Sequence, residues 1–361
     1  MTLVGEVLEL AYGKALKASD RSGGDIPVVG SGGVVGGHDV GITGSPTIVV
    51  GRKGSIGSVT WIDGPAWPID TAYYVKAQRP DIDLRWSYWM LRSLRMETMN
   101  KSAAIPGLNR DDVYRLAIDV PSLSEQQRIA AILDKADALR AKRRQVLAHL
   151  DDLAQAIFHD MFGRQDWPTT SLEAVCIVAG EYGAGVPGTE PDAALPRYLR
   201  ITDIAENGRL NDDVRAPGGE PRQWAQYRLE DGDVLFARSG ATVGKTYRYR
   251  SADGPAVFAG YLIRFRPDPE LIDPDFLFGF TRTSAYSSWV SARQKVVAQP
   301  NINAKQYGRE LQVPLPPLDR QREFARRTVE LHRRRDQVMT AVERDDELFT
   351  SLQARAFRGE L

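Results

Sequence analysis

The sequence predicts an α+β protein with a pseudo-twofold internal repeat, in which two mixed α/β domains are separated by two long helices that form an antiparallel coiled coil. The main observation is that Pro121-Ser122-Leu123-Ser124-Glu125-Gln126 recurs as Pro316-Pro317-Leu318-Asp319-Arg320-Gln321, an offset of 195 between positions 121 and 316. Each copy opens a stretch with helical periodicity. Solenoid repeats have periods of roughly 20–50 residues, so this offset indicates a duplicated domain followed by a duplicated helix. The predicted segments are domains 1–120 and 164–315 and helices 121–163 and 316–361.

The first long helix is predicted over 124–162. Ser124 is a suitable N-cap with Gln127 three residues later, and Gly163 is a plausible stop. Apolar residues recur at alternating spacings of three and four, with Arg143 as one polar interruption, which is the pattern of a heptad seam. The predicted seam consists of Ile129, Ile132, Ala136, Leu139, Arg143, Val146, Leu150, Leu153 and Ile157.

The second long helix keeps this register less well, because Arg327, Arg334 and Asp345 interrupt it. Its predicted seam consists of Phe324, Leu331, Val338, Ala341, Leu348 and Leu352. A long helix cannot bury a stripe against itself, so the seam needs a partner. We expect the other helix of the same chain, packed antiparallel; a coiled-coil homodimer is the alternative.

Composition excludes several classes of protein. The chain has 361 residues with zero formal net charge and no apolar run near the roughly 18 residues that span a membrane. Segment 1–6 lacks the basic start and apolar core of a signal peptide, so we expect a cytoplasmic protein with no membrane partner. Cys176 is expected in a buried strand, and the four histidines form no metal-ligand spacing. Zero net charge does not exclude DNA, because a local basic face can be balanced elsewhere.

The two domains share a glycine-rich basic loop that follows a buried strand. Strands are predicted at 47–50 and 234–237, and the loops that follow cover 51–58 and 238–246. Arg52 aligns with Arg238, and both loops lead into further strands at 59–61 and 247–249, then at 72–75 and 260–263. The aromatic stretches 86–91 and 276–280 are interpreted as core helices, and 105–109 matches 299–303.

The second loop resembles a phosphate-binding loop only in part. Gly244-Lys245-Thr246 fits the end of the G-x-x-x-x-G-K-[ST] pattern, but Gly240 is one residue too close and Ser239 occupies the first position. Such a loop should open a helix, whereas 247–250 has a strand pattern. We therefore do not assign nucleotide binding, and we find no nucleophile elbow, methyltransferase motif or nuclease spacing that would indicate catalysis.

A loop of small residues with Arg, Lys, Ser and Thr can instead lie against a DNA backbone, and Arg or Asn can read base edges. The alternative is a β-hairpin whose charges only face water. Polar residues occupy equivalent places in both copies, and these are the candidate DNA contacts: Arg52, Lys53, Ser55, Asn109 and Arg110 in the first domain, and Arg238, Ser239, Thr242, Lys245, Asn301, Asn303 and Lys305 in the second.

The whole chain resembles the specificity (S) subunit of type I restriction–modification enzymes. The resemblance rests on the order of several motifs: 12–17 (YGKALK), 27–33 (PVVGSGG), 51–57 (GRKGSIG), 67–73 (WPIDTAY), and the two spacer openings at 121–128 and 316–321. The second domain matches the opening pattern poorly, with 182–185 as a loose counterpart of 12–15. It is therefore expected to belong to a different recognition class.

The resemblance implies two target-recognition domains, each reading one half of a split double-stranded DNA site. It implies that the helices set the gap between the halves and dock two modification subunits, which carry the S-adenosylmethionine site, and that two restriction subunits can join. The chain itself would bind no cofactor or metal and catalyse nothing. Three alternatives stay open from the residues: a stand-alone nuclease or NTPase, a protein scaffold without DNA, and a subunit of a related fused modification/restriction system.

Overall fold

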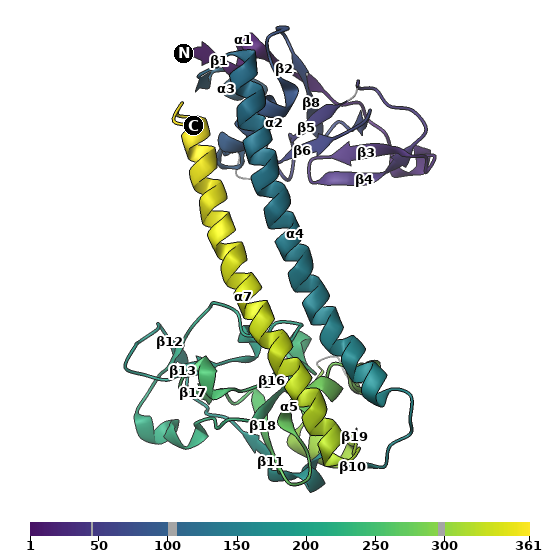
Figure 1. Ribbon diagram of the computed structural model, residues 1–361, viewed down its shortest axis with the longest axis vertical. Coiled ribbons are helices and arrows are strands. Elements are labelled where there is room, and N and C mark those ends of the chain that lie inside the picture. Colours follow the sequence, from purple (N-terminus) through teal and green to yellow (C-terminus); the bar gives the residue numbers. More distant parts are fainter. Residues whose placement is uncertain (45, 100–106, 295–299) are drawn as a thin grey trace. The chain divides into compact units, whose positions relative to one another are not determined.

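The computed structural model describes residues 1–44, 46–99, 107–294 and 300–361. The chain packs as two units, one comprising Met1–Arg144 with Thr340–Leu361 and the other Gln145–Met339. The two long helices, α4 (Leu123–Phe162) and α7 (Leu318–Ala356), therefore contribute to both units (Figure 1). The prediction of two long helices is confirmed, and the four-part division of the chain into domains and spacers stays a prediction.

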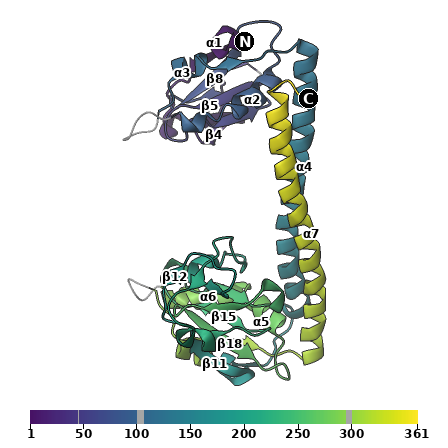
Figure 2. The same cartoon turned by 90° about the vertical axis from the view of Figure 1, so that its left-hand side faces the viewer.

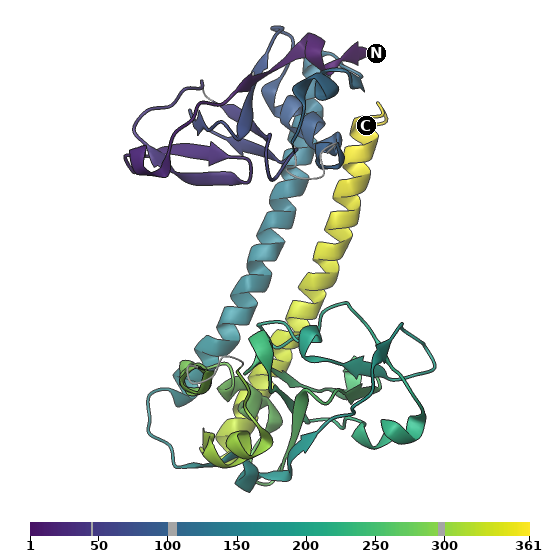
Figure 3. The ribbon, with the colours of Figure 1, turned by 180° about the vertical axis from the view of Figure 1, so that it is seen from behind.

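Unit 1 is built on an antiparallel sheet in the order β2-β8-β5-β6, with a second sheet in the order β4-β3-β7. The β3–β4 hairpin projects from the main sheet on the side away from α4 (Figures 1 and 3). The elements of this unit before α4 are β1 (Thr2–Leu3), α1 (Val4–Val7), β2 (Leu8–Tyr12), β3 (Ile26–Gly30), β4 (Gly33–His38), β5 (Thr47–Gly51), β6 (Val59–Ile62), β7 (Trp67–Pro68), β8 (Ala72–Ala77), α2 (Leu84–Ser93), α3 (Arg110–Tyr114) and β9 (Ala117–Ile118).

Unit 2 has a main antiparallel sheet in the corresponding order β11-β18-β15-β16. Its smaller sheets include a parallel pair, β13 with β17, which matches the parallel pair β3 with β7 of unit 1. Its elements between the long helices are β10 (Thr169–Ser171), β11 (Cys176–Tyr182), β12 (Gly188–Thr189), β13 (Arg197–Leu199), β14 (Ala216–Pro217), β15 (Val234–Ala237), β16 (Thr246–Arg248), β17 (Ala256–Phe258), β18 (Leu262–Pro267), α5 (Pro274–Phe280), α6 (Ser284–Gln294), a π-helix (Gln306–Glu310) and β19 (Gln312–Pro314).

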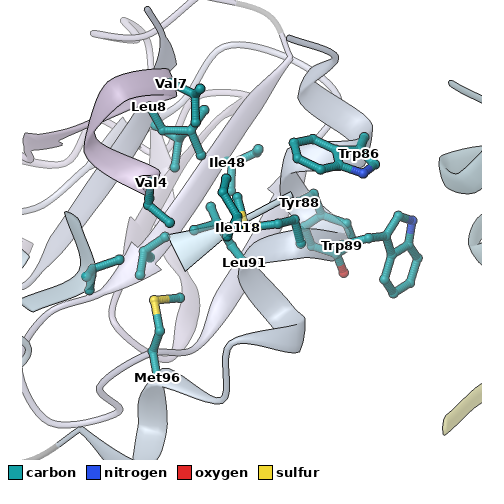
Figure 4. Close-up of a cluster of buried hydrophobic side chains, with 14 of the residues drawn as sticks. Val4, Val7, Leu8, Ile48, Trp86, Tyr88, Trp89, Leu91, Met96 and Ile118 are labelled. Carbon is teal, nitrogen blue, oxygen red and sulfur yellow. The ribbon is translucent and has the colours of Figure 1, made fainter. Parts of the chain in front are cut away.

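The predicted strands and aromatic core helices are confirmed. Strands β5 and β15 are buried along their whole lengths, as a central position in each sheet requires. The strand predicted over 260–263 begins later, at Leu262. Helices α2 and α5 lie between the sheet and the long helices of their units, and their aromatic residues are largely buried (Figure 2). In unit 1 the apolar core gathers Val4, Leu8 and Ile48 with Trp86 and Trp89 (Figure 4).

A buried glutamine fixes the start of each long helix to its unit. In unit 1, Gln126 is fully buried, accepts from the backbone N–H of Asp83 at 2.8 Å, and donates to the carbonyls of Asp81 and Pro121 at 2.9 Å. In unit 2, fully buried Gln321 accepts from the N–H of Asp273 at 2.9 Å and donates to the Pro316 carbonyl at 2.8 Å. Buried amide groups need such partners. We call these two residues the glutamine latches.

The N-cap prediction for α4 is wrong by two residues, because Ser124 was predicted and Ser122 is the cap. The helix begins at Leu123, so Ser122 is the cap; its hydroxyl accepts from the N–H of Glu125 at 3.4 Å. Ser122 with Glu125 three residues later fits the capping-box pattern better than Ser124 with Gln127. The end is as predicted, because α4 stops at Phe162 and the Gly163 N–H returns to the His159 carbonyl at 2.7 Å.

The predicted seam is right at one of its two heptad positions and mostly wrong at the other, where Ile132 and Ala341 are half-buried but the remaining predicted residues are exposed. The series Ile129, Ala136, Arg143 and the series Phe324, Leu331, Val338 are buried or half-buried. Four predicted seam residues are instead exposed, namely Leu139, Val146, Leu153 and Leu348, at 44, 43, 43 and 55%. On α7, the second buried series lies one residue after the predicted one. It consists of Gln321, Thr328, Arg335, Val342, Phe349 and Ala356. Polar residues occupy half of it, so a search for apolar spacing misses it.

The two long helices contact each other within unit 1, and they run in opposite directions there. Arg140 lies with its guanidinium carbon 4.2 Å from the Phe349 ring centre and its Nε 2.6 Å from Asp346. One turn later, Arg143 donates to the Ala341 carbonyl at 3.0 Å. Residue numbers thus rise on α4 as they fall on α7. Arg140 and Arg144 both hold the pKa of Asp346 below its ordinary value.

Candidate nucleic-acid interface

The basic loop of unit 1 follows β5 and is held by backbone hydrogen bonds on both sides. The N–H of Arg52 donates to the Thr71 carbonyl at 2.9 Å, and its own carbonyl accepts from Leu108 at 2.8 Å. Lys53 pairs with Gly107 as an isolated bridge. Gly57 has a φ of 70°, and a side chain there would come within 2.5 Å of the backbone at Met96 and Glu97. The loop conformation is therefore fixed by its glycine and by its neighbours.

Two arginines of unit 1 lie against one tyrosine ring. The guanidinium carbons of Arg52 and Arg110 are 4.9 and 4.7 Å from the centre of the Tyr12 ring. Arg52 also lies 5.8 Å from the Tyr73 ring and donates from Nη1 to the Asp70 carbonyl at 3.0 Å. Tyr12 is half exposed, so this cluster is at the surface. Burial, together with Tyr12, raises the pKa of Tyr73, although Arg52 opposes this shift.

The remaining candidates of unit 1 differ in how free their polar groups are. Lys53 and Ser55 are exposed. Ser55 lies beside the turn of the β3–β4 hairpin, because a side chain at Gly32 would be 3.5 Å from the Ser55 hydroxyl. Asn109 is the N-cap of α3, and its side-chain oxygen accepts from the N–H of Asp111 at 2.9 Å. The candidates therefore gather around one loop, with Asn109 partly committed to the fold.

The loop of unit 2 repeats this backbone frame. The carbonyl of Arg238 accepts from Ile302 at 2.9 Å, and Ser239 pairs with Asn301 as an isolated bridge. The Arg238 guanidinium carbon is 4.8 Å from the Tyr182 ring, and the Tyr182 hydroxyl accepts from the N–H of Ala304 at 3.1 Å. Tyr182 is 38% exposed. Positions 105, 106 and 299 of the predicted match lie outside the described residues, and the rest of the match occupies equivalent places.

Other candidates of unit 2 already have partners within the fold. The Lys245 ammonium lies 2.9 Å from Glu206 and donates to the Ile204 carbonyl at 3.3 Å. The Thr242 hydroxyl donates to the Ser239 carbonyl at 3.0 Å. Asn303 exchanges hydrogen bonds with Gln306, both at 3.0 Å. Asn301 and Lys305 are exposed. Among the candidates of unit 2, four are placed best to meet a ligand, namely Arg238, Ser239, Asn301 and Lys305.

The structure also adds two residues that the sequence did not single out as contacts, Tyr12 and Tyr182. Each ends the edge strand of its main sheet, and each lies under the arginine that begins the loop. A signal was present, because both tyrosines precede a glycine near the start of their domains. Pattern alone could not show that Tyr12 and Arg52, forty positions apart, share one surface.

The structure also bears on the nucleotide, thiol, metal and membrane chemistry that the sequence analysis considered. Thr246 begins strand β16, as predicted, rather than the helix that a phosphate-binding loop requires. Cys176 begins the edge strand β11 and is half-buried, so the prediction of a buried strand is wrong. Burial of the thiol still raises its pKa to about 12, so the thiol is protonated at neutral pH. The described residues contain no cluster of potential metal ligands. Nor does any described helix have the length and apolarity needed to cross a membrane.

Comparisons with known proteins give one consistent family. Residues 2–149 match the type I restriction modification DNA specificity domain. The type I restriction enzyme EcoDI specificity subunit of Escherichia coli is 27% identical over 315 residues, covering 78% of this chain and 70% of the relative. The EcoBI specificity subunit of the same species is 24% identical over 351 residues, covering 87% and 73%.

Solved structures agree on the fold. The S subunit of a type I restriction–modification system from M. genitalium has a TM-score of 0.65 at 18% identity, covering 98% of this chain and 95% of the other. A chain from a study of complex assembly and conformational transition of the type I system has a TM-score of 0.55 at 16% identity, covering 100% and 97%. At these identities the likeness describes the fold.

Proposed function

We propose that this chain acts as a specificity subunit of a type I restriction–modification system, the family to which the comparisons point. In this proposal each unit reads one half of a split double-stranded DNA site. The observation that carries the proposal is the duplicated loop frame. Arg52 and Arg238 occupy the same place in two sheets of the same strand order, with their carbonyls bonded to Leu108 and Ile302. The residues around these arginines differ, which is what two different half-sites require.

The long helices would set the distance between the half-sites as an antiparallel coiled coil with pseudo-twofold symmetry. In unit 1, the contacts of Arg140 and Arg143 with α7 support this arrangement, because they show that the two helices run in opposite directions there. A helix of 40 residues is roughly 60 Å long, which exceeds the ~34–36 Å between major-groove sites one DNA turn apart. The exposed faces of these helices would dock two modification subunits, which supply the S-adenosylmethionine chemistry, and restriction subunits would join that complex.

The chain itself would act in the cytoplasm by recognition, without catalysing a reaction. Within the interface, we assign the leading contacts to the exposed or half-exposed groups: Arg52, Lys53, Ser55 and Arg110 in unit 1, and Arg238, Ser239, Asn301 and Lys305 in unit 2. Asn109, Asn303, Thr242 and Lys245 would act mainly by holding the loops, because their polar atoms already have partners. Arginine is suited both to reading a base and to binding the backbone, since it can pair with guanine and can bind phosphate.

The experiment that tests this proposal is a genome-wide map of methylated bases in the native host, with the gene intact, deleted and restored. We expect a split motif with a fixed gap to lose its methylation on deletion and regain it on restoration. Restoration with the Arg52→Ala or Arg238→Ala variant should lower methylation of the same motif. A motif set that is unchanged by deletion, in cells shown to express the partner methyltransferase, would contradict the proposal.

A further inference from the structure

The tyrosine at the edge of each main sheet has a feature that the proposed function does not use. Tyr12 ends β2 and Tyr182 ends β11, and each ring carries a guanidinium on it. Both rings are partly exposed, at 50 and 38%, although an aromatic ring at this place could pack inward. The ring, the arginine and the loop backbone recur together in both units, so the stack is part of the duplicated frame.

Stacking controls how an arginine is presented. A guanidinium that lies on an aromatic ring within about 6 Å is attracted by the ring face, and its planar edge of N–H donors is left for a ligand. Arg52 uses Nη1 for the Asp70 carbonyl, which fixes one end of its plane. In unit 2, the Arg238 Nε atom is buried without a hydrogen-bond partner among the described residues. Arg52 is therefore oriented by its ring and by a hydrogen bond before any ligand arrives, whereas Arg238 is oriented by its ring alone.

The two copies differ in how the ring is used. In unit 1 a second guanidinium, from Arg110, lies on the Tyr12 ring. The equivalent position in unit 2 is Ala304, whose N–H bonds to the Tyr182 hydroxyl instead. Two cations on one ring repel each other. An anion that lies between or beside the two guanidiniums offsets this repulsion. A DNA phosphate is the anion that the proposed function supplies.

We infer that Tyr12 and Tyr182 are positioning residues for phosphate-binding arginines, forming a two-arginine clamp in unit 1 and a one-arginine contact in unit 2. This inference rests on the proposed function. The tyrosines touch no phosphate in it; they orient the arginines that do. Because a phosphate contact carries no sequence information, the clamp acts on any duplex and fixes the position of unit 1 on the DNA backbone.

A double-mutant cycle on the 361-residue chain tests the inference, with a fluorescent mixed-sequence DNA duplex as the probe. Each ring–guanidinium contact at an exposed site corresponds to roughly 2–5-fold in affinity. Tyr12→Leu should therefore weaken binding by roughly 4–25-fold and Tyr182→Leu by roughly 2–5-fold. Tyr12→Phe keeps the ring and should bind like the wild type. In an Arg52→Ala, Arg110→Ala background, Tyr12→Leu should have no further effect.

Two further variants separate positioning from a general loss of structure. Arg52→Lys keeps the charge but not the planar stack, so it should lose most of what Arg52→Ala loses. Tyr74→Leu removes a neighbouring ring that carries Lys76 at 5.3 Å and should bind like the wild type. Tyr74 is a matched control because adjacent strand residues face opposite sides of the sheet.

The possible outcomes are distinct. A wild-type chain that fails to bind the duplex contradicts the proposed function and the inference together. A wild-type chain that binds, with Tyr12→Leu or Arg52→Lys equal to it, contradicts the inference alone. The same is true if Tyr12→Leu loses equal affinity with and without the two arginines, because the ring would then act independently of them.

Discussion

The two units share a hydrogen-bonded frame and differ in the side chains placed on it. The carbonyls of Arg52 and Arg238 accept from Leu108 and Ile302 in the same way, and both arginines stack on a tyrosine. Unit 1 adds Arg110 to the ring, whereas unit 2 has Ala304. Backbone geometry is thus retained where it holds the loop, and charge is varied where a ligand would meet it.

The attachment of the long helices shows the same division. Each unit retains a glutamine latch, Gln126 or Gln321. In unit 1, Asp134 of α4 accepts from Arg85 at 2.7 Å and from Trp89 at 2.8 Å. In unit 2, the corresponding contact is a cluster of phenylalanines from α4, α5 and α7 with ring centres 4.9–5.9 Å apart. The aromatic contacts of the long helices therefore differ: in unit 1 Trp89 contacts both Asp134 and Phe349, whereas in unit 2 phenylalanines pack on one another.

The largest expected effect concerns the apolar attachment of unit 2. Phe324 is 2% exposed and packs against Phe158 and Phe162. Phe324→Ala should lower the free energy of unfolding by about 3–5 kcal/mol, because it removes a buried ring and leaves a cavity. Urea unfolding measures the change, and hydrogen exchange should place it in unit 2. Leu348→Ala, at an exposed position of the same helix, is the control and should stay within about 0.5 kcal/mol.

The glutamine latches come next. Gln126→Leu would leave the Asp83 N–H and two carbonyls unpaired in a buried site, whereas Gln321→Leu would strand one N–H and one carbonyl. We expect losses of about 2–4 kcal/mol for each, with the larger one at Gln126. Chemical denaturation checks this, with exposed Gln127→Leu as the control. A loss below that of the control would show that the latches do not hold the helix starts.

Acidification should separate the two units. Burial, assisted by Arg250, lowers the pKa of His332 in unit 2 from 6.5 to about 4. Its Nδ1 lies 3.3 Å from Arg250, which donates to it only while that nitrogen is unprotonated. As the pH falls, His332 takes up a proton in the unfolded chain before it does so in the folded chain. The contribution of neutral His332 to folding stability is therefore complete above pH 6.5 and is lost as the pH falls toward 4.

The size of this effect is on the order of 2 kcal/mol after allowance for partial exposure. In unit 1, Asp346 has a lowered pKa, so its contribution is present above pH 3.8 and is lost only at lower pH. Hydrogen exchange at pH 7, 5 and 4 should show unit 2 loosening first. His332→Gln should flatten that dependence. Equal loosening of both units between pH 6.5 and 4 would contradict the assignment.

The smallest effect tests the difference between the two arginine clusters. Arg110→Ala should weaken binding of a mixed-sequence duplex by roughly 2–5-fold and lower the slope of log affinity against log salt by about one. Ala304→Arg, the converse change, should raise that slope by about one. If neither variant changes the slope, the charge difference between the two clusters does not reach the DNA backbone.

Much of this fold could be predicted because its signals are local. The strands before each loop, the aromatic helices and both long helices follow from apolar runs, turn residues and periodicity. The second half of the seam could not, because buried Gln126, Thr328 and Arg335 and half-buried Arg140 occupy positions that apolar spacing passes over. Such residues bury their alkyl stems or complete a hydrogen-bond network, and only the packed structure shows this.

The candidate site was predicted in outline. Residue type and duplication identified the two loops, and the structure places Arg52 beside Arg110 as a surface cluster. Asn109 caps α3 through a bond to the N–H of Asp111 two residues later, a local signal that the sequence analysis did not use. Sequence could not reveal that Lys245 is paired with Glu206, because that contact joins residues distant in the chain. The roles of Tyr12 and Tyr182 depend on contacts across the sheet edge for the same reason.

The central claim is that each unit reads one half of the site, and a domain exchange tests it most directly. Residues 1–120 would be replaced by the equivalent domain of a relative with a different motif, and methylated bases would be mapped genome-wide in a host that lacks the native gene. We predict a hybrid motif in which one half changes while the other half and the gap are retained. A motif in which both halves change together, or neither does, would contradict the account.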